Sequence, residues 1–262
     1  MSLSGSVKWR YRVAPVVFLL CTDPCFAIVN IEDLKIEATP GFSGQVAFSA
    51  TGQSGNTDKS IVSVGARLQW HRGTSTDIIV GNADRGETSG VTDTDKAFVH
   101  ARHIQYVKER LAWEIFGQIE QDEFTRLSYR TLLGGGLRWT AYKQAEERTS
   151  VTTGAGAFYA REKLDPLEGT TDAGIERLWR GNFYVSVKHR VNDNLRLAST
   201  TYWQPALREF SDYQALEQLA LVVKLTDALD LKLSVDIAYD SEPPQLVENT
   251  DVTYRTGIEY DF

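Results

Sequence analysis

Several features of membrane-spanning helical proteins and nucleic-acid binders are missing from this chain. It has two cysteines, one methionine and seven prolines in 262 residues, and its mean hydropathy is only −0.29. A helical membrane protein needs repeated apolar stretches of about 20 residues, and none is present. A basic surplus is also absent, because 28 Lys and Arg stand against 35 Asp and Glu. These absences exclude a polytopic helical protein and argue against a nucleic-acid partner.

The first 27 residues have the order of a cleavable signal peptide. Basic residues precede an apolar run over 13–21, and a small-residue exit ends at Ala27, where we expect the cut. An uncleaved anchor is the alternative, but this run of nine residues is shorter than the roughly 20 that a spanning helix needs. A lipoprotein signal ending at Cys21 is a further alternative, weakened by Leu20, where a small residue is expected.

Cleavage at this site would leave a short periplasmic segment, residues 28–40, followed by one domain over residues 41–262. It would remove three basic residues and one acidic residue, which takes the formal net charge from −7 to −9. Both cysteines would also be removed, so the exported chain would form no disulfide. Its stability must then come from a large core or from lipid.

From Phe42 onward the dominant hydrophobic period is two, the period of a β-strand. In the final stretch, Val252, Tyr254 and Thr256 begin an apolar face that ends at Phe262, and polar residues alternate with them. The whole chain divides into about twelve such segments, at 42–51, 59–70, 76–84, 95–107, 111–119, 126–139, 149–163, 181–191, 195–204, 213–225, 231–239 and 251–262. This pattern predicts an all-β fold, a transmembrane antiparallel up-and-down β-barrel.

The links between these segments favour one orientation in an outer membrane. Short turns alternate with long polar links, which we place at 85–94, 164–180, 205–212 and 240–250. Outer-membrane barrels have short periplasmic turns and longer external loops, and an even strand number puts both ends on the periplasmic side. Large aromatic residues also cluster at both strand ends, as interfacial girdles require: Trp70, Trp113, Trp139, Phe183, Trp203, Tyr213 and Tyr239. A soluble sandwich or lipocalin-like barrel is the rival interpretation, because it uses the same alternation.

Several scattered motifs resemble a known family. They include Ser54–Asp58 between the first two strands, Asp122 and Phe124 with Gly134–Leu137, and Tyr239–Ser241 with the two prolines that follow. Together they are similar to the salt-induced outer-membrane proteins, a bacterial family of unknown function, over residues 41–262. The resemblance implies an outer-membrane barrel and no particular activity.

No catalytic, metal or cofactor site is predicted. His100 and His103 are three residues apart in a strand, which puts them on opposite faces and prevents joint metal binding. The acids Glu120, Asp122 and Glu123 are interpreted as part of a solvated link, as are those between 84 and 95. An outer-membrane hydrolase remains the weaker alternative.

The polar face of the strands, assigned to the lumen, supports a better hypothesis. Its predicted charged residues are Arg67, Glu114, Arg130, Arg138, Lys188, Arg190, Arg196, Lys224, Lys232, Asp236, Arg255 and Glu259. Basic groups outnumber acids there, and a basic pore favours anions. The chain is therefore interpreted as a narrow passive channel for small anionic solutes. The alternative is a structural or stress-response barrel whose lumen is closed by Arg–Glu pairs, since barrels of about twelve strands lie between the filled and the open sizes.

The remaining expectations concern partners. The apolar face would contact outer-membrane lipid and lipopolysaccharide, and the terminal Tyr260 and Phe262 would serve as the signal for the barrel assembly machinery. Glu217 falls on the apolar face of its strand, where a carboxylate is tolerated only near the interface.

Overall fold

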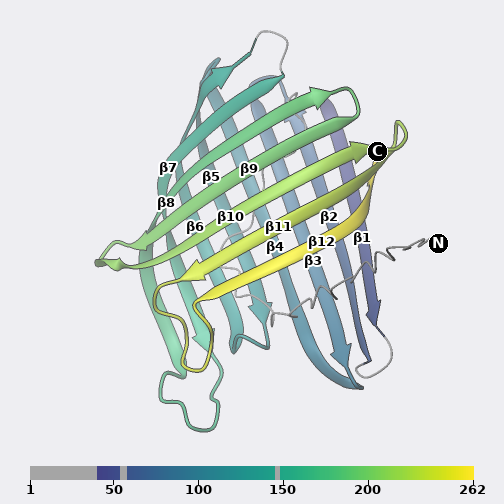
Figure 1. Ribbon diagram of the computed structural model, residues 1–262. Coiled ribbons are helices and arrows are strands. Elements are labelled where there is room, and N and C mark those ends of the chain that lie inside the picture. The colour runs from purple at the N-terminus through teal and green to yellow at the C-terminus, as the bar shows by residue number, and fades with distance from the viewer. Residues whose placement is uncertain (1–39, 54–57, 145–147) are drawn as a thin grey trace, which may run out of the picture.

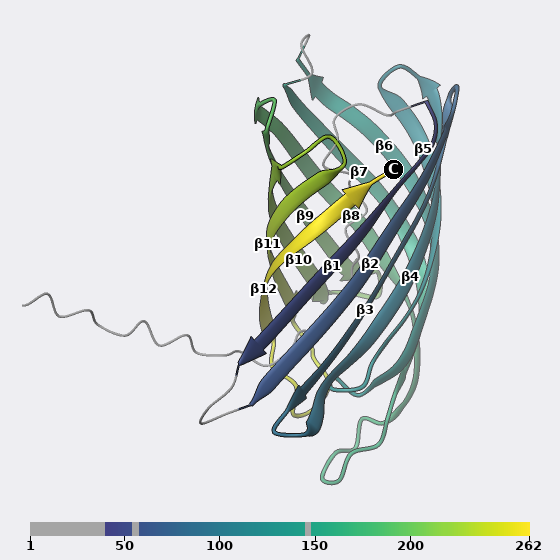
Figure 2. The same ribbon diagram turned by 90° about the vertical axis from the view of Figure 1, so that its right-hand side faces the viewer.

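The computed structural model describes residues 40–53, 58–144 and 148–262 of the chain. Within them, twelve antiparallel strands close into one barrel, each beside its neighbours in sequence, with β1 beside β12 (Figures 1 and 2). The strands are β1 (Gly41–Gln53), β2 (Lys59–Arg72), β3 (Ser75–Thr88), β4 (Val91–Lys108), β5 (Leu111–Asp122), β6 (Leu127–Lys143), β7 (Thr149–Leu164), β8 (Gly174–Asn192), β9 (Leu195–Ala206), β10 (Glu209–Lys224), β11 (Leu229–Asp240) and β12 (Thr250–Asp261). The predicted twelve-stranded all-β barrel is confirmed. The predicted signal at 1–27 and all but the last residue of the segment 28–40 lie outside the described residues.

The alternation of polar and apolar residues along each strand corresponds to the inner and outer faces of the barrel. In β5, Glu114, Phe116 and Gln118 are buried in the barrel while Ile115 and Ile119 between them are more than half exposed. Successive side chains of a strand point to opposite faces, so closure of the sheet sends the polar set inward. No helix long and apolar enough to span a membrane occurs in the described residues.

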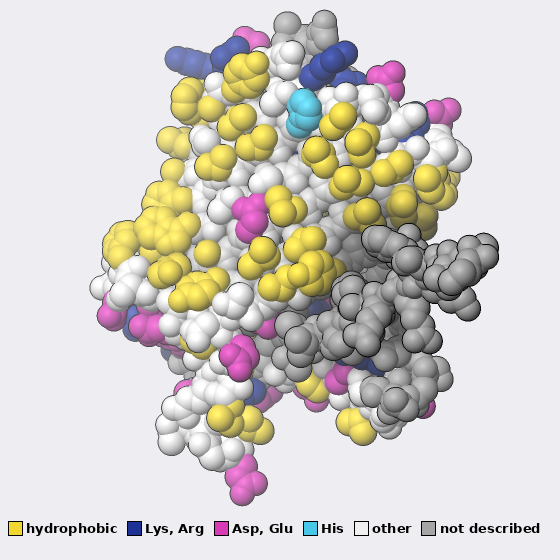
Figure 3. All heavy atoms as spheres, in the orientation of Figure 1, with side chains coloured by type: hydrophobic (Ala, Val, Ile, Leu, Met, Phe, Trp, Pro, Cys, Tyr) yellow, Lys and Arg dark blue, Asp and Glu magenta, His cyan; other side chains and the backbone are white. Residues whose placement is uncertain are grey.

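The outer face is apolar in its middle and charged at its rims. On the side seen in Figure 3, hydrophobic side chains cover the central zone and charged side chains gather at both ends, although an acidic side chain interrupts the apolar zone. Glu217 of β10 is on this face, where its carboxylate accepts hydrogen bonds from the hydroxyls of Ser199, at 2.7 Å, and Thr201. These hydroxyls satisfy an acid whose neighbours on the face include Leu219 and Trp203.

The aromatic residues expected at the strand ends lie on the outer face, and four of them pack in two pairs. Phe183 and Trp203 have ring centroids 5.5 Å apart, as do Tyr213 and Tyr239. At the closing seam, the backbone of Phe262 exchanges hydrogen bonds of 2.9 and 3.0 Å with Gly44. The proposed role of Tyr260 and Phe262 in assembly stays a prediction.

Two of the long links predicted from the sequence are wrong. The stretch 85–94 continues the β3–β4 hairpin and turns only at Ser89 and Gly90, while 205–212 is reduced to a two-residue link between β9 and β10. The residues of these stretches point into the barrel or lie beyond the apolar zone, and many of them are polar. The apolar alternation from which the strands were predicted is therefore not visible there. Of the described links on the rim opposite the chain ends, only 165–173 and 241–249 are long.

One half of the interior is filled by aromatic rings. Phe116 and Phe158 pack edge to face with centroids 6.4 Å apart, and Tyr184 and Tyr202 have centroids 5.3 Å apart. The glycines of β6 and β7 make room for these rings. A Cβ on Gly134 would lie 2.5 Å from the Cβ of Phe158 and 2.7 Å from the carbonyl oxygen of Ala157.

We expect Gly134→Ala to lower the free energy of unfolding by about 1–3 kcal/mol, the usual cost of overpacking, because neither neighbour is a flexible side-chain end. Gly117→Ala is the matched control, since its added methyl would meet neighbours only at 3.6 and 3.8 Å. Urea unfolding of the folded barrel in phospholipid vesicles measures both. Equal stability of the two variants would show that the rings do not need the space at Gly134.

Candidate functional site

The other half of the interior contains a cavity of about 230 Å³. It lies among β1–β3 and β10–β12, with Phe98 of β4 and Ala198 of β9 completing the wall. Gly, Ala and Ser make up a large part of the wall, among them Ala47, Ser49, Ser63, Gly65, Ala220, Ser234 and Gly257. The cavity therefore exists because the inward positions of these strands carry small residues, where β5–β8 carry rings and arginines.

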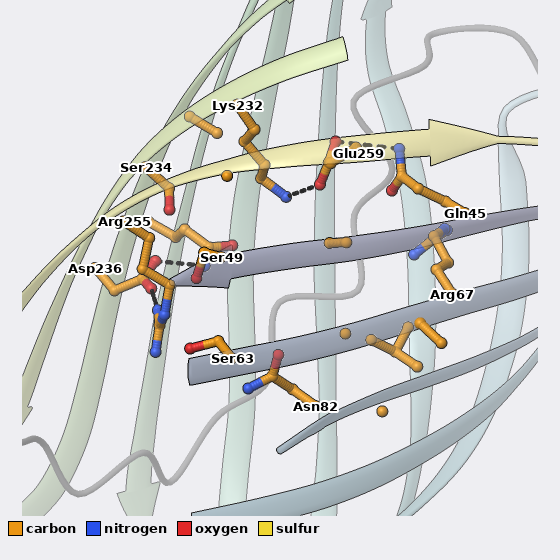
Figure 4. Close-up of a pocket in the computed structure, with 18 of the residues that line it drawn as sticks. Gln45, Ser49, Ser63, Arg67, Asn82, Lys232, Ser234, Asp236, Arg255 and Glu259 are labelled. Atoms are coloured by element: carbon orange, nitrogen blue, oxygen red, sulfur yellow. Dashed lines mark hydrogen bonds and ion pairs between the residues drawn. The ribbon is translucent and has the colours of Figure 1, made fainter. Parts of the chain in front are cut away.

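Five of the charged residues predicted to line a lumen line this cavity: Arg67, Lys232, Asp236, Arg255 and Glu259. Figure 4 shows Lys232 directed at Glu259, and Glu259 beside Gln45 of β1. The Lys232 ammonium is 2.8 Å from a Glu259 oxygen, and the Gln45 amide donates to the other oxygen at 3.1 Å. Arg67 donates to the Gln69 side chain at 3.1 Å.

Arg255 extends from β12 across the interior. Its guanidinium pairs with Asp236 on the adjacent β11 and lies 3.3 Å from a carboxylate oxygen of Asp84 on β3, beyond β1 and β2. Arg255 also borders a second, smaller cavity of about 40 Å³ that contains Asp84 and Lys96. The two cavities thus meet at a charged bridge that links β3 to β11 and β12, across β1 and β2.

Glu114 and Arg138, two further predicted lumen residues, are buried in the filled half. Glu114 receives the guanidinium of Arg102 at 3.1 Å and the hydroxyl of Tyr184 at 3.2 Å. Arg138 in turn donates to that hydroxyl oxygen at 3.0 Å. This connected cluster joins β4, β5, β6 and β8 across the interior.

Arg130 is the centre of a second buried cluster. Its guanidinium donates to Glu120 at 2.6 Å and to Glu162 at 2.8 Å. Glu120 also accepts from the amide of Gln118 at 2.6 Å, and Gln118 contacts the ring of His100 at 2.9 Å. Opposite charges are thus paired along the wall from β4 to β7, which is a condition for burying ions.

The remaining predicted lumen residues lie toward the short-turn rim. Lys188 and Arg190 are half-buried on the inward face of β8, and Arg190 stands opposite Arg196 in the ladder. Arg196 pairs with Asp230 of β11. Lys224 is the last residue of β10 and reaches Asp227 in the following turn at 2.7 Å, so it belongs to the rim and lies away from the cavity.

The predicted excess of basic groups inside the barrel is wrong. Nine carboxylates are buried in the described residues, against the three or four expected: Asp84, Glu114, Glu120, Asp122, Asp212, Asp230, Asp236, Asp251 and Glu259. Asp84, Glu120 and Asp122 had been interpreted as acids of solvated links. Glu120 and Asp122 were missed because β5 extends further than the apolar pattern indicates, whereas Asp84 is the last residue of the predicted segment 76–84. The alternation continued through these acids is the signal that would have placed them inside.

Arg126, which the sequence did not single out, ties three links of one rim together. It is buried in the β5–β6 turn, where its backbone has a φ of 64°. Its guanidinium holds the Asp172 carboxylate at 2.7 Å and donates to the carbonyl oxygens of Asp165 and Gln245 at 3.0 Å each. The two long links of this rim are therefore held by one side chain.

No group of three or more His, Cys, Asp or Glu side chains suited to a metal occurs in the described part of the chain. His100 and His103 lie on opposite faces, as predicted. His100 is buried inside, whereas His103 contacts Asp77 at 2.6 Å and packs on Trp113 of the outer face.

Comparison with known proteins identifies a family and a fold. The model of the family described as "Protein of unknown function, DUF481" matches residues 46–262. Among solved structures, the NanC porin has a TM-score of 0.50 at 10% identity, with 84% of this chain and 99% of the porin covered. The translocator domain of the autotransporter NalP from Neisseria meningitidis has a TM-score of 0.48 at 11% identity, covering 84% of this chain and 88% of that domain.

These likenesses concern the barrel fold alone, since identities are low. A search of curated proteins found no match. The predicted resemblance is confirmed as far as a family of unknown function and a porin-like barrel, and nothing found supports the salt-induced attribute.

We expect Arg130→Met to lower the unfolding free energy by about 3–5 kcal/mol, because it leaves two carboxylates buried without their cation. Arg208→Met is the control, since the Arg208–Glu176 pair is exposed and should contribute no more than about 1 kcal/mol. Adding Glu120→Gln and Glu162→Gln to Arg130→Met should restore much of the loss. Urea unfolding in vesicles checks all three, and a small effect of Arg130→Met would contradict a tightly packed ionic wall.

The link between Arg126 and Asp172 should weaken only in strong acid. The Arg126 hydrogen bond, followed by that from the Gln245 backbone, lowers the pKa of Asp172 from 3.8 to about 2. A lowered pKa stabilises the folded arrangement above the ordinary value, and that stabilisation is lost as the pH falls through about 2. We expect pepsin to cut 165–173 faster in Asp172→Asn than in the parent at pH 3.8, with the difference vanishing near pH 2. A pH-independent difference would refute the role of this carboxylate.

Proposed function

We propose, from the premise that this chain belongs to the DUF481 family of proteins of unknown function, that it is a narrow passive channel of the bacterial outer membrane. The observation that carries the proposal is the cavity between β1–β3 and β10–β12, inside a porin-like barrel. Small side chains keep this half open, while the opposite half is packed. The solute path would follow the open half.

The apolar outer zone supports the membrane location. Aromatic side chains flank it at both strand ends, as in membrane barrels, and the predicted signal peptide, with its cut after Ala27, would direct export. Outer-membrane lipid, lipopolysaccharide and the barrel assembly machinery would then be the natural partners of the outer face and the last strand.

We propose that the solutes are small and hydrophilic, and that the channel has a weak preference for anions. Arg67, Lys232 and Arg255 contribute three positive charges to the cavity wall, while Asp236 and Glu259 contribute two negative charges. Because four of these five groups are paired with one another, the net field is small, and we propose a modest anion preference. Arg255 and Asp84 would form the narrowest charged point of the path.

A non-conducting structural barrel is the second candidate. The observation in its favour is the filled half, where the rings of Phe116, Phe158 and Tyr184 and the ion pairs of Arg130 are buried in the interior. Such packing would reinforce the envelope without passing solute, and a role in envelope stress would fit it.

Conductance in planar bilayers tests the channel. We expect discrete steps with a reversal potential shifted toward the anion equilibrium potential. Ser63→Lys should increase that shift and Ser63→Glu should reverse it, because Ser63 lines the cavity and carries no charge of its own. Ser60→Lys, on the outer face of the same strand and on the wall of neither cavity, is the control for added charge away from the path.

Absence of steps in the parent would favour the structural barrel. Equal effects of Lys at position 63 and at position 60 would show that ions do not pass through the cavity.

A further inference from the structure

The seam between β1 and β12 is paired over only half of its possible length. The ladder pairs run from Gln45–Asp261 to Phe48–Ile258, and in each pair the two residue numbers add to 306. The same register would place Ser49 opposite Gly257 and Gln53 opposite Thr253, since both strands continue that far. Those five further pairs are absent. Elsewhere in the barrel, neighbouring strands pair along most of their common length, as β1 and β2 do from Gly41–His71 to Gln53–Lys59.

The unpaired half begins near the middle of the barrel and runs toward the rim with the long links. Figure 2 shows β1 and β12 together near the C label and separating away from it. In a bilayer each unsatisfied backbone group costs several kcal/mol. The unpaired backbone N–H and C=O groups of a seam that is open at this depth therefore need hydrogen bonds from water in the interior or from a polar ligand.

The interior cavity reaches this seam. Its wall includes Ser49 and Phe48 on β1 and Arg255 and Gly257 on β12, the residues at which pairing stops. Phe48 has its side chain on the outer face, where it is 55% exposed, yet it also belongs to the cavity wall. Tyr254 of β12, 71% exposed, stands beyond the seam on the same outer face.

Both charged and apolar side chains border this opening. Arg255 and Lys232 lie on the inner side, close to the strand edges, as Figure 4 shows for Arg255 and Ser49. Both are already ion-paired, Arg255 with Asp236 and Asp84 and Lys232 with Glu259, so an incoming carboxylate has to compete with these partners. Val80, Phe98 and Leu216 add apolar surface to the same cavity. Phe48 and Tyr254 border the seam on the outer side.

We infer that the open half of the β1–β12 seam is a lateral portal through which a single-chain acidic amphiphile, a fatty acid, passes between the membrane and the cavity. The carboxylate enters first, binds Arg255 and Lys232 and hydrogen-bonds to the free strand edges. The hydrocarbon chain stays between Phe48 and Tyr254 and follows into the apolar part of the cavity. This route goes beyond the axial channel proposed above, because the ligand arrives from lipid.

A disulfide that closes the seam is the direct test. Ala50 and Thr256, both on the outer face, would face each other if the register continued, and their numbers also add to 306. Closed antiparallel strands hold such residues at about 5.5 Å between Cα atoms, within disulfide range. The double variant Ala50→Cys with Thr256→Cys should therefore oxidise slowly, and only when the seam closes.

The matched control uses the same cysteine on the other side of β1. Ala50 is opposite Val62 in the formed β1–β2 ladder, so Ala50→Cys with Val62→Cys should oxidise readily and leave the seam open. Residues 41–262 contain no other cysteine. Both variants are compared oxidised and reduced, in vesicles of phosphatidylethanolamine and phosphatidylglycerol.

The probe is palmitic acid carrying a photoreactive diazirine near its carboxylate, with the matching alcohol as the uncharged control. We expect adducts at Phe48, Ser49 and Arg255 in the parent and in the Ala50–Val62 variant. Labelling should fall to that of heat-denatured protein in the oxidised Ala50–Thr256 variant and return on reduction. The alcohol should label these residues much less, as should the acid with Arg255→Gln.

Two results would overturn the portal: rapid oxidation of Ala50–Thr256 at the rate of the control, which means a closed seam, or unchanged labelling after the seam is locked. Ion conductance measured on the same locked protein separates this proposal from the previous one. Conductance without fatty-acid labelling would support the axial channel and contradict the portal. Labelling without conductance would support the portal and contradict the axial channel.

Discussion

The structure depends on one constraint: a sheet surrounded by apolar medium must satisfy its backbone within itself. Closure of twelve strands provides neighbours for nearly every peptide group, and the period-two sequence then decides which side chains face outward. Polar residues have no other place than the interior. Burying so many of them is possible because arginines and carboxylates are placed opposite one another, as Arg130 is with Glu120 and Glu162.

Closure also explains why the two halves of the interior differ. The glycines at 134 and 154 allow the rings of Phe158 and Tyr184 to lie against the wall, and around these rings the buried ion pairs exclude water. On the other half, Ala, Ser and Gly occupy many of the inward positions. A closed cylinder with one filled side and one open side is the result, and both functional proposals concern the open side.

The sequence was sufficient for the strand number, the all-β class and the assignment of faces, because the alternation from Val252 to Phe262 is unambiguous and recurs along the chain. It was insufficient at the rims. Asp84 and Glu120 continue the inward set of their strands, but their charge led to an assignment as link residues. Pairings such as Arg255 with Asp84 join positions 171 residues apart, and no local pattern encodes them. The prediction of excess positive charge inside was wrong for the same reason. The basic residues were assigned to the interior from the alternation, whereas their acidic partners were assigned to surface links.

The asymmetry of the interior has a consequence for engineering. On the filled side, a changed residue leaves a ring without support or an ion without its counterion, so this wall tolerates little redesign. On the open side, positions such as Ser63 and Ser234 face free volume and take part in none of the ion pairs described. The width and the charge of the cavity can therefore be changed by substitutions on the open side only, while the filled wall stays unaltered.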